Sequence, residues 1–159
     1  MKRKKNILDK IGSLIPGYKG YVVREEKRNS DKKFRDQLAS SLSNSEEYVI
    51  RFQKELLNSK DMISISNWEM ARKPINTIGA KIKHATYGES SFFSEMQLKE
   101  EELEQIYNYD LELAEKVSLI SKTIQDEILE PMSSGFVLKQ VFDIEQILIK
   151  RTNLINQYK

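Results

Sequence analysis

The chain has 159 residues, of which 39% are hydrophobic and 31% charged, and it contains no cysteine. Disulfides, thiolate nucleophiles and cysteine-ligated metals are therefore excluded. The net charge is only +2, but residues 1–35 hold twelve Lys/Arg against four Asp/Glu, whereas residues 36–159 hold fourteen against twenty. A chain of this length can bury one core of its own, and the uneven charge predicts a basic arm on an acidic body.

The first 17 residues are predicted to form a separate basic amphipathic segment, a short helix that ends at Pro16-Gly17. Its apolar positions are too interrupted for a signal peptide. The segment could lie on an anionic bilayer, dock on a partner or on the chain's own bundle, bind nucleic acid, or stay disordered. The candidate membrane or partner contact consists of ten basic and apolar residues: Lys2, Arg3, Lys4, Lys5, Ile7, Leu8, Lys10, Ile11, Leu14 and Ile15.

Residues 18–159 are predicted to form a single all-α domain, a bundle of three to four long helices. No sheet is expected, because two-residue alternation of apolar and polar residues is nowhere sustained. The first long helix is expected over about residues 22–58, in one piece or restarting at a capping box of Ser43 and Glu46. Residues 24–33 are almost wholly polar, so this stretch should project from the core.

A second helix is expected over about residues 61–86, with a heptad-like apolar seam and either a kink or a fresh start at Pro74. A third is expected over about residues 99–130, where four glutamates near its start complement the helix dipole. Residues 131–135 should break the chain before a last helix over about 136–157. This last helix is apolar over much of its circumference, so it should be the most buried.

The sequence lacks the residue patterns of the common catalytic sites. Its one histidine, His84, is preceded three residues earlier by Lys81, whereas a di-metal carboxylate bundle needs a Glu-x-x-His from each of two helices. No glycine-rich phosphate loop, nucleophile elbow or zinc-protease motif is present. We therefore expect no enzymatic activity, no cofactor and no bound metal.

Asp110 is the one carboxylate on the otherwise apolar seam of the third long helix. It is interpreted either as an acid, base or ligand anchor with a raised pKa, or as a structural residue. In the structural case Asp110 reaches water or pairs with a base of the second helix: Arg72, Lys81 or His84. Asp110, His84 and Arg72 are accordingly the candidate buried polar residues.

Aromatic residues gather in two linkers and form a candidate interaction patch: Tyr18, Tyr21, Tyr87, Phe92 and Phe93. Such rings could make an exposed apolar surface for a partner. The two tyrosines of the first linker could also stack on nucleic-acid bases beside Lys19. The alternative is that all these rings pack over the end of the bundle.

Two stretches, Gly17-Tyr18-Lys19-Gly20-Tyr21 and His84-Ala85-Thr86-Tyr87-Gly88, look familiar. The second continues through Phe92-Phe93 and a run of glutamates to Tyr107-Asn108-Tyr109-Asp110-Leu111. Residues 17–21 and 84–111 resemble a group of uncharacterised bacterial all-helical proteins. The resemblance implies a bacterial, cytoplasmic helical protein and carries no activity or site residues.

The leading hypothesis is a non-enzymatic adaptor or scaffold that binds protein, either itself or another chain, with the basic arm as a second contact. A cytoplasmic location is expected. The alternative is a peripheral protein of the inner membrane, attached to anionic lipid through residues 2–15. A third hypothesis is a nucleic-acid accessory protein, whose binding should fall steeply with salt.

Overall fold

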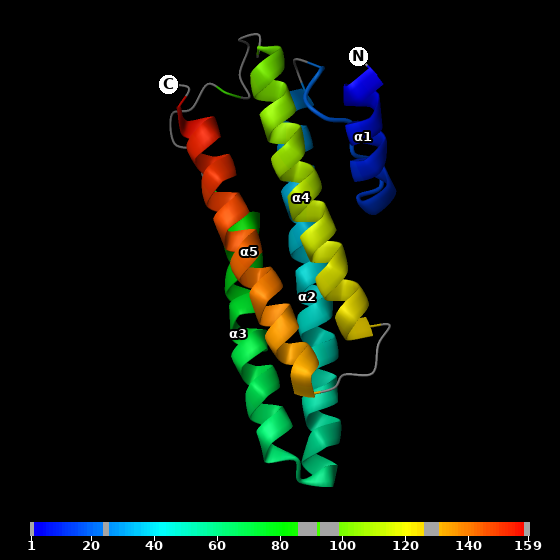
Figure 1. Ribbon diagram of the computed structural model, residues 1–159, viewed down its shortest axis with the longest axis vertical. Coiled ribbons are helices and arrows are strands. Elements are labelled where there is room, and N and C mark those ends of the chain that lie inside the picture. Colours follow the sequence, from blue (N-terminus) through cyan, green and yellow to red (C-terminus); the bar gives the residue numbers. More distant parts are fainter. Residues whose placement is uncertain (1, 24–25, 86–91, 93–98, 126–130, 158–159) are drawn as a thin grey trace.

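The computed structural model describes residues 2–23, 26–85, 92, 99–125 and 131–157. Over these residues the chain is all-α and contains no strand, which confirms the predicted fold class. Its five helices are α1 (Lys2–Leu14), α2 (Lys27–Ser59), α3 (Met62–Lys83), α4 (Glu100–Gln125) and α5 (Pro131–Asn156) (Figure 1).

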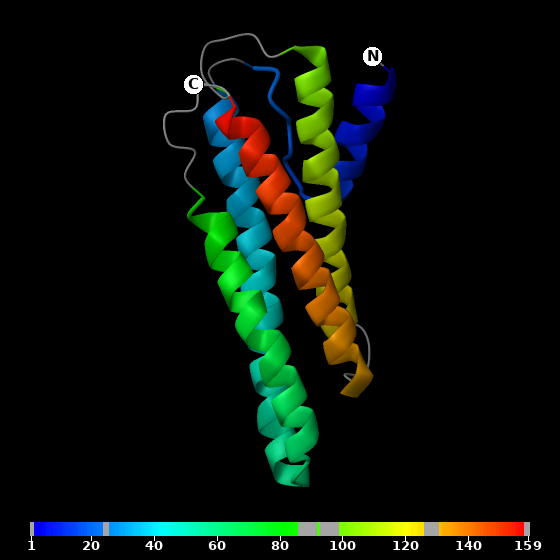
Figure 2. The same cartoon turned by 60° about the vertical axis from the view of Figure 1, so that its left-hand side comes forward.

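The four long helices form a bundle in which successive helices run in opposite directions (Figures 1 and 2). Helix α2 packs against α3 and α4, and α5 packs against the same two helices. The order around the bundle is therefore α2, α3, α5, α4. The short helix α1 packs against α4, on the outside of the bundle.

One main core runs between the four helices, built from apolar residues spaced three and four apart. The predicted seam of α3 is a clear example, because Trp68, Ile75 and Ile82 are all at most 1% exposed. A second, smaller cluster is built from residues of the first linker, the segment before α4, α4 itself and the end of α5: Tyr21, Phe92, Ile106, Tyr107, Leu154 and Ile155.

The apolar stripe of α1 faces the bundle. Ile11 and Ile15 are 0% and 5% exposed and belong to the main core. Burying an isoleucine side chain contributes about 1.5–3 kcal/mol, so these two residues provide much of the driving force that holds α1 against the bundle. The chain then turns at Gly17 and Gly20, which have φ angles of +85° and +72°.

Two open questions about helix continuity are answered by the structure. Helix α2 continues through the proposed capping box, where the Ser45 hydroxyl donates to the Ser41 carbonyl at 3.0 Å. Helix α3 continues through Pro74, so the suggestion that a new helix starts there is wrong. Its start is set by Asp61, whose carboxylate accepts hydrogen bonds from the Ser64 amide at 3.1 Å and the Ser64 hydroxyl at 2.7 Å.

Two predictions about α2 and α5 are wrong and a third is confirmed. The polar stretch 24–33 does not simply project from the core, because Lys27 and Asp31 are 6% and 2% exposed. Helix α5 begins at Pro131 instead of after residue 135; proline at a first helical position needs no backbone donor. The prediction that the last helix is the most buried is confirmed, because α5 has the largest share of buried residues of the five helices, although Phe142 is 61% exposed.

None of the helices within the described residues is long and apolar enough to cross a membrane.

Candidate functional site

Asp110 lies at the centre of a buried polar network. Its side chain is 0% exposed, and both carboxylate oxygens accept hydrogen bonds. Oδ2 accepts from the hydroxyls of Tyr18 and Tyr21, at 2.7 and 2.5 Å. Oδ1 accepts from Nε of Arg151 at 2.7 Å. The first linker, α4 and α5 are therefore joined at a single carboxylate.

The network continues from Arg151 into α2 and reaches the end of α3. The Arg151 guanidinium also donates to Oδ1 of Asp31 at 2.6 Å and to the Tyr21 hydroxyl at 3.0 Å. Oδ2 of Asp31 accepts from Nε of Arg35 at 2.9 Å. Arg35 in turn donates to the carbonyls of Ile82 and Lys83, at 3.0 and 2.9 Å.

The acceptors of Arg35 are carbonyls of the last turn of α3, which have no partner further along their own helix. Two carboxylates and two guanidiniums thus alternate in sign through the bundle: Asp110, Arg151, Asp31 and Arg35. Alternation matters because a buried charge is tolerated only when it is paired and hydrogen-bonded. All four helices of the bundle contribute a group to this network.

Aromatic rings enclose the network. The rings of Tyr21 and Tyr107 are stacked with centroids 5.8 Å apart, and the edge-to-face pair of Tyr18 and Phe34 has centroids 5.3 Å apart. The Arg151 guanidinium carbon lies 5.7 Å from the centroid of Phe34. The Tyr107 hydroxyl accepts the backbone N–H of Tyr21 at 3.1 Å, which fixes the linker on α4.

Burial raises the pKa of the Asp110 carboxyl, while the charge of Arg151 and the tyrosine hydrogen bonds oppose that rise. Burial, and then the neighbouring Asp110 charge, raise the pKa of Tyr18 and Tyr21 well above 10. Both tyrosines therefore remain protonated at neutral pH and serve as hydrogen-bond donors.

This arrangement is suited to holding the bundle together and poorly suited to acid–base chemistry. A general acid or base must reach the proton that it transfers, but Asp110 is fully buried and its oxygens are occupied. A surface pocket of about 380 Å³ between the first linker and α2 is lined by Tyr18, Lys19, Lys33 and Phe34, among others, but not by Asp110. We interpret the network as a structural clamp.

The partner of Asp110 differs from the prediction. Arg72 donates to Glu46 at 2.8 Å and to Glu69, on the bundle surface, and His84 is exposed, so neither is a buried polar residue. Lys81 pairs with Glu145 at 3.0 Å. The expectation of a base from the second helix is therefore wrong, and the base comes from the last helix.

Sequence reasoning missed Arg151, Asp31 and Arg35, although a pattern pointed to each. Arg151 lies three residues after Leu148 and four before Ile155, so it occupies the apolar seam of α5 as Asp110 occupies that of α4. Asp31 and Arg35 continue the α2 seam of Leu38 and Leu42 toward the N-terminus at steps of four and three. The surrounding polar residues hid that seam.

The ten candidate contact residues, which lie on α1 and at the following Ile15, differ in how far they are buried. Ile11 and Ile15 are buried, Lys10 is exposed, and Ile7, Leu8 and Leu14 are partly buried against the core. The side chains of residues 2–5 (Lys2, Arg3, Lys4 and Lys5) lie outside the described part of the chain.

The candidate aromatic patch is not an exposed surface where the structure describes it. Tyr21 and Phe92 are 1% and 0% exposed, and Tyr18 is partly buried. Tyr87 and Phe93 lie outside the described residues. The described rings pack over the end of the bundle, which was the alternative interpretation. Within the same described residues, no group of acidic or histidine side chains could hold a metal ion.

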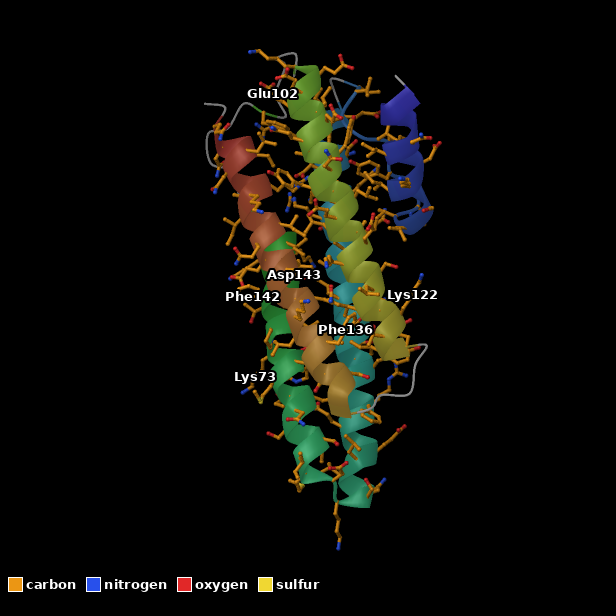
Figure 3. All side chains as sticks on the ribbon, in the orientation of Figure 1. Lys73, Glu102, Lys122, Phe136, Phe142 and Asp143 are labelled. Atoms are coloured by element: carbon orange, nitrogen blue, oxygen red, sulfur yellow. The ribbon has the colours of Figure 1, made fainter. Side chains whose placement is uncertain are left out.

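The exposed apolar side chains of α5 are the second notable feature. Phe142 and Ile149 are 61% and 48% exposed and lie seven residues apart, hence on one side of the helix. Phe136 is 42% exposed and lies nearer the start of α5; Figure 3 labels it with Phe142. We call the side that carries Phe142 and Ile149, together with the neighbouring Leu138 and Gln146, the outer α5 face.

Comparison with known proteins gives no relative: no family model, no curated protein and no solved structure matches the chain.

Proposed function

We propose that the protein is a non-catalytic helical interaction protein that binds a partner protein through the outer α5 face. The observation that carries this proposal is the exposure of Phe142 and Ile149 on one side of α5. Large apolar side chains exposed together on one side of a helix can mark a site for a partner. Among the described helices, α3 and α4 pack along α5 and leave the outer α5 face open, so a partner on this face would bury Phe142 and Ile149.

The chemistry of this face is that of protein contacts. Large apolar side chains in a polar rim are typical anchors of protein interfaces. Here the rim contains ion pairs between Lys81 and Glu145 at 3.0 Å and between Lys116 and Asp143 at 3.3 Å. The charges of these two pairs already have partners, so covering them would not leave them unpaired. Lys139 and Lys150 are also exposed on this helix, so the partner would have to offer acidic groups or leave both side chains in contact with water.

The basic residues near the N-terminus offer a second possible contact for the partner. Lys10, Lys19, Lys32 and Lys33 are exposed on α1, the first linker and the first turns of α2. An acidic protein surface would suit this basic arm and would speed association at low salt.

A photo-crosslinking experiment tests the proposed face. Benzoylphenylalanine would replace Phe142 in one variant and Tyr48 in the control, because Tyr48 is an exposed aromatic residue of α2. After irradiation in native cell extract, we expect crosslinked species from position 142 and few from position 48. The proposal fails if position 142 gives no crosslink, or none beyond those of position 48.

The structure offers little support for the membrane alternative, because the apolar stripe of α1 packs against the bundle. Attachment would require α1 to leave α4 and expose Ile11 and Ile15. Co-sedimentation of the full chain with anionic vesicles tests this hypothesis, and we expect no binding at physiological salt. Stacking on nucleic-acid bases is likewise poorly supported, since the hydroxyls of Tyr18 and Tyr21 are bonded to Asp110.

A further inference from the structure

We infer that the partner on the outer α5 face contributes an acidic amphipathic helix, whose apolar side chains cover Phe142 and Ile149 and whose carboxylates meet lysines on both flanks of these two residues. This inference rests on the proposed function and names the chemistry of its partner. An amphipathic helix that lies in a groove is a recurring mode of protein recognition. The charges around the outer α5 face show which kind of helix would fit there.

Two exposed lysines lie on the flank of α5 that is nearer α4. Lys139 and Lys150 are eleven residues apart, close to three full turns, so their side chains leave the helix in nearly the same direction. Asp143 lies one turn after Lys139 and pairs with Lys116 of α4 at 3.3 Å, which places this flank beside α4. Within the described residues, neither Lys139 nor Lys150 forms an ion pair, so both charges are available to a partner.

A groove with a basic rim lies on the opposite flank, between α3 and α5. It has a volume of about 270 Å³ and is lined by Pro74, Ile78 and Val141, with Lys73 and Lys81 beside them. Lys81 pairs with a carboxylate of α5 at 3.0 Å, whereas the exposed Lys73, labelled on α3 in Figure 3, forms no ion pair within the described residues. The groove suits an apolar side chain of the partner that has a carboxylate next to it, facing Lys73.

Positive charge is in excess around the outer α5 face. Both carboxylates of α5 that border it are in ion pairs. Three exposed lysines of α3 and α5 have no such pair within the described part of the chain: Lys73, Lys139 and Lys150. On α4, the exposed Glu112 lies one turn before Lys116 and offsets at most one of these charges. A partner that covers Phe142 and Ile149 brings its own surface close to the lysines, and a lysine that loses contact with water needs an acidic group nearby.

The same face is poorly matched to an anionic bilayer, although lysines beside exposed apolar side chains also occur on membrane-binding surfaces. Asp143 and Glu145 lie on either side of Phe142 around the helix, with side chains 34% and 39% exposed. A continuous anionic surface would bring negative charge against both carboxylates. A helix carries its carboxylates at discrete positions, so it can meet the lysines without approaching these two acidic groups.

Two synthetic amphipathic peptides that differ only in charge test this inference on the full chain. Both carry a stripe of leucines, bordered on each side by glutamates in one peptide and by lysines in the other. Fluorescence anisotropy should show at least about tenfold tighter binding of the glutamate peptide, because several exposed charge pairs act together. Phe142→Gln/Ile149→Gln should weaken this binding by at least about tenfold, because the apolar anchors are lost.

Charge reversal shows where the glutamate peptide binds. Lys139→Glu/Lys150→Glu should reverse the preference, so that the lysine peptide binds more tightly. The control Lys32→Glu/Lys33→Glu changes two exposed lysines of the basic arm and should leave the preference as it is. Equal affinity for the two peptides, no binding of either, or a preference that only the control variant changes would overturn the inference.

The photo-crosslinking experiment at position 142 separates this inference from the proposed function. The crosslinked segment of the captured protein, identified by mass spectrometry, should be a helix with more Asp and Glu than Lys and Arg. A segment without this excess of acidic residues would overturn the inference but leave the proposed function in place. Failure to crosslink any protein from position 142 would remove both.

Discussion

At the level of single residues, the pairing of Asp110 and Arg151 explains how charges are tolerated inside the bundle. Each has under 2% of its side chain exposed, and Nε of Arg151 lies 2.7 Å from Oδ1 of Asp110. A buried pair adds little net stability over apolar residues of similar shape, but removing one partner strands the other charge. The pair therefore specifies how the linker, α4 and α5 fit together more than it stabilises them.

Replacing Asp110 with Leu should lower the free energy of unfolding by about 3–5 kcal/mol, because Arg151 would lose one of its two carboxylate partners. The double variant Asp110→Leu/Arg151→Met should cost at least about 1 kcal/mol less than the sum of the two single changes. Asp143→Leu, at a partly exposed ion pair, is the control and should cost under about 1 kcal/mol. Urea unfolding measures all four, and additive effects would contradict the paired role.

Gly20 holds the linker against α4 in a conformation that other residues rarely adopt. A Cβ atom there would lie 2.7 Å from the Tyr107 hydroxyl and 2.9 Å from Leu8, at a φ of +72°. Gly20→Ala should therefore destabilise the protein by about 2 kcal/mol or more. Gly12→Ala, in α1 and with open space around it, should instead be neutral or stabilise by up to about 1 kcal/mol. Equal thermal shifts for both variants would contradict this role of Gly20.

Part of the network could be predicted from sequence, and the rest depended on packing. Asp110 stood out because it interrupts an apolar seam, and the structure confirms that it is buried. Its partner could not be identified, because helical periodicity shows which residues share a face but not which helices become neighbours. Asp31 was hidden more thoroughly, since it lies in a run of polar residues where a buried carboxylate resembles an exposed one.

At the level of elements, the α2–α3 hairpin is held by a cluster of polar groups on its surface. Glu69 accepts hydrogen bonds from Arg72 and, at 3.0 Å, from Gln53, while Arg72 also reaches Glu46 at 2.8 Å. The hydrogen bond from Arg72 has the largest effect and that from Gln53 the next largest, and together they lower the pKa of Glu69 to about 2. Ionised Glu69 thus favours the folded hairpin.

Because of this lowered pKa, the contribution of Glu69 to the free energy of unfolding depends on pH. The contribution of Glu69 should be present above its ordinary pKa of about 4.5 and should disappear as the pH falls toward 2, because the unfolded chain takes up the proton first. Glu69→Gln should therefore be less stable than wild type at pH 6 and nearly equal to it at pH 2. Urea midpoints at several pH values measure the gap. A gap that persists unchanged at pH 2 would contradict the assignment.

Helix positions were predictable from sequence where the apolar spacing was regular, as in α3, whose seam of Ile75, Ile78 and Ile82 is buried as expected. The surroundings of a helix were not predictable in the same way. Helix α5 was expected to be the most buried because of its composition, and it does have the largest share of buried residues. Composition did not show which of its sides would stay open, because that depends on where the neighbouring helices lie. Among the described helices, α3 and α4 pack along α5, and the side of α5 that carries Phe142 remains open.

At the level of the whole molecule, the buried polar network and the exposed α5 face lie in separate places and have separate roles: the network holds the helices together, and the face is the proposed contact surface. The network joins all four long helices and the first linker, and it encloses its charges away from solvent. Phe142 and Ile149 lie outside this network, on a helix whose inner side is part of the core. A bundle that exposes large apolar side chains on one side of α5 has what the proposed role as an interaction protein requires.

The measurement that tests this most directly is the sedimentation of the protein in native cell extract, for wild type and for Phe142→Gln/Ile149→Gln. A control variant, Leu57→Gln/Ile63→Gln, removes two exposed apolar residues of the α2–α3 hairpin, which are 57% and 75% exposed. We expect the wild type and the control to sediment faster than a single chain, and the α5 variant to sediment as a single folded chain with unchanged melting. Sedimentation of the α5 variant identical to that of the wild type would contradict the proposed role of the outer α5 face.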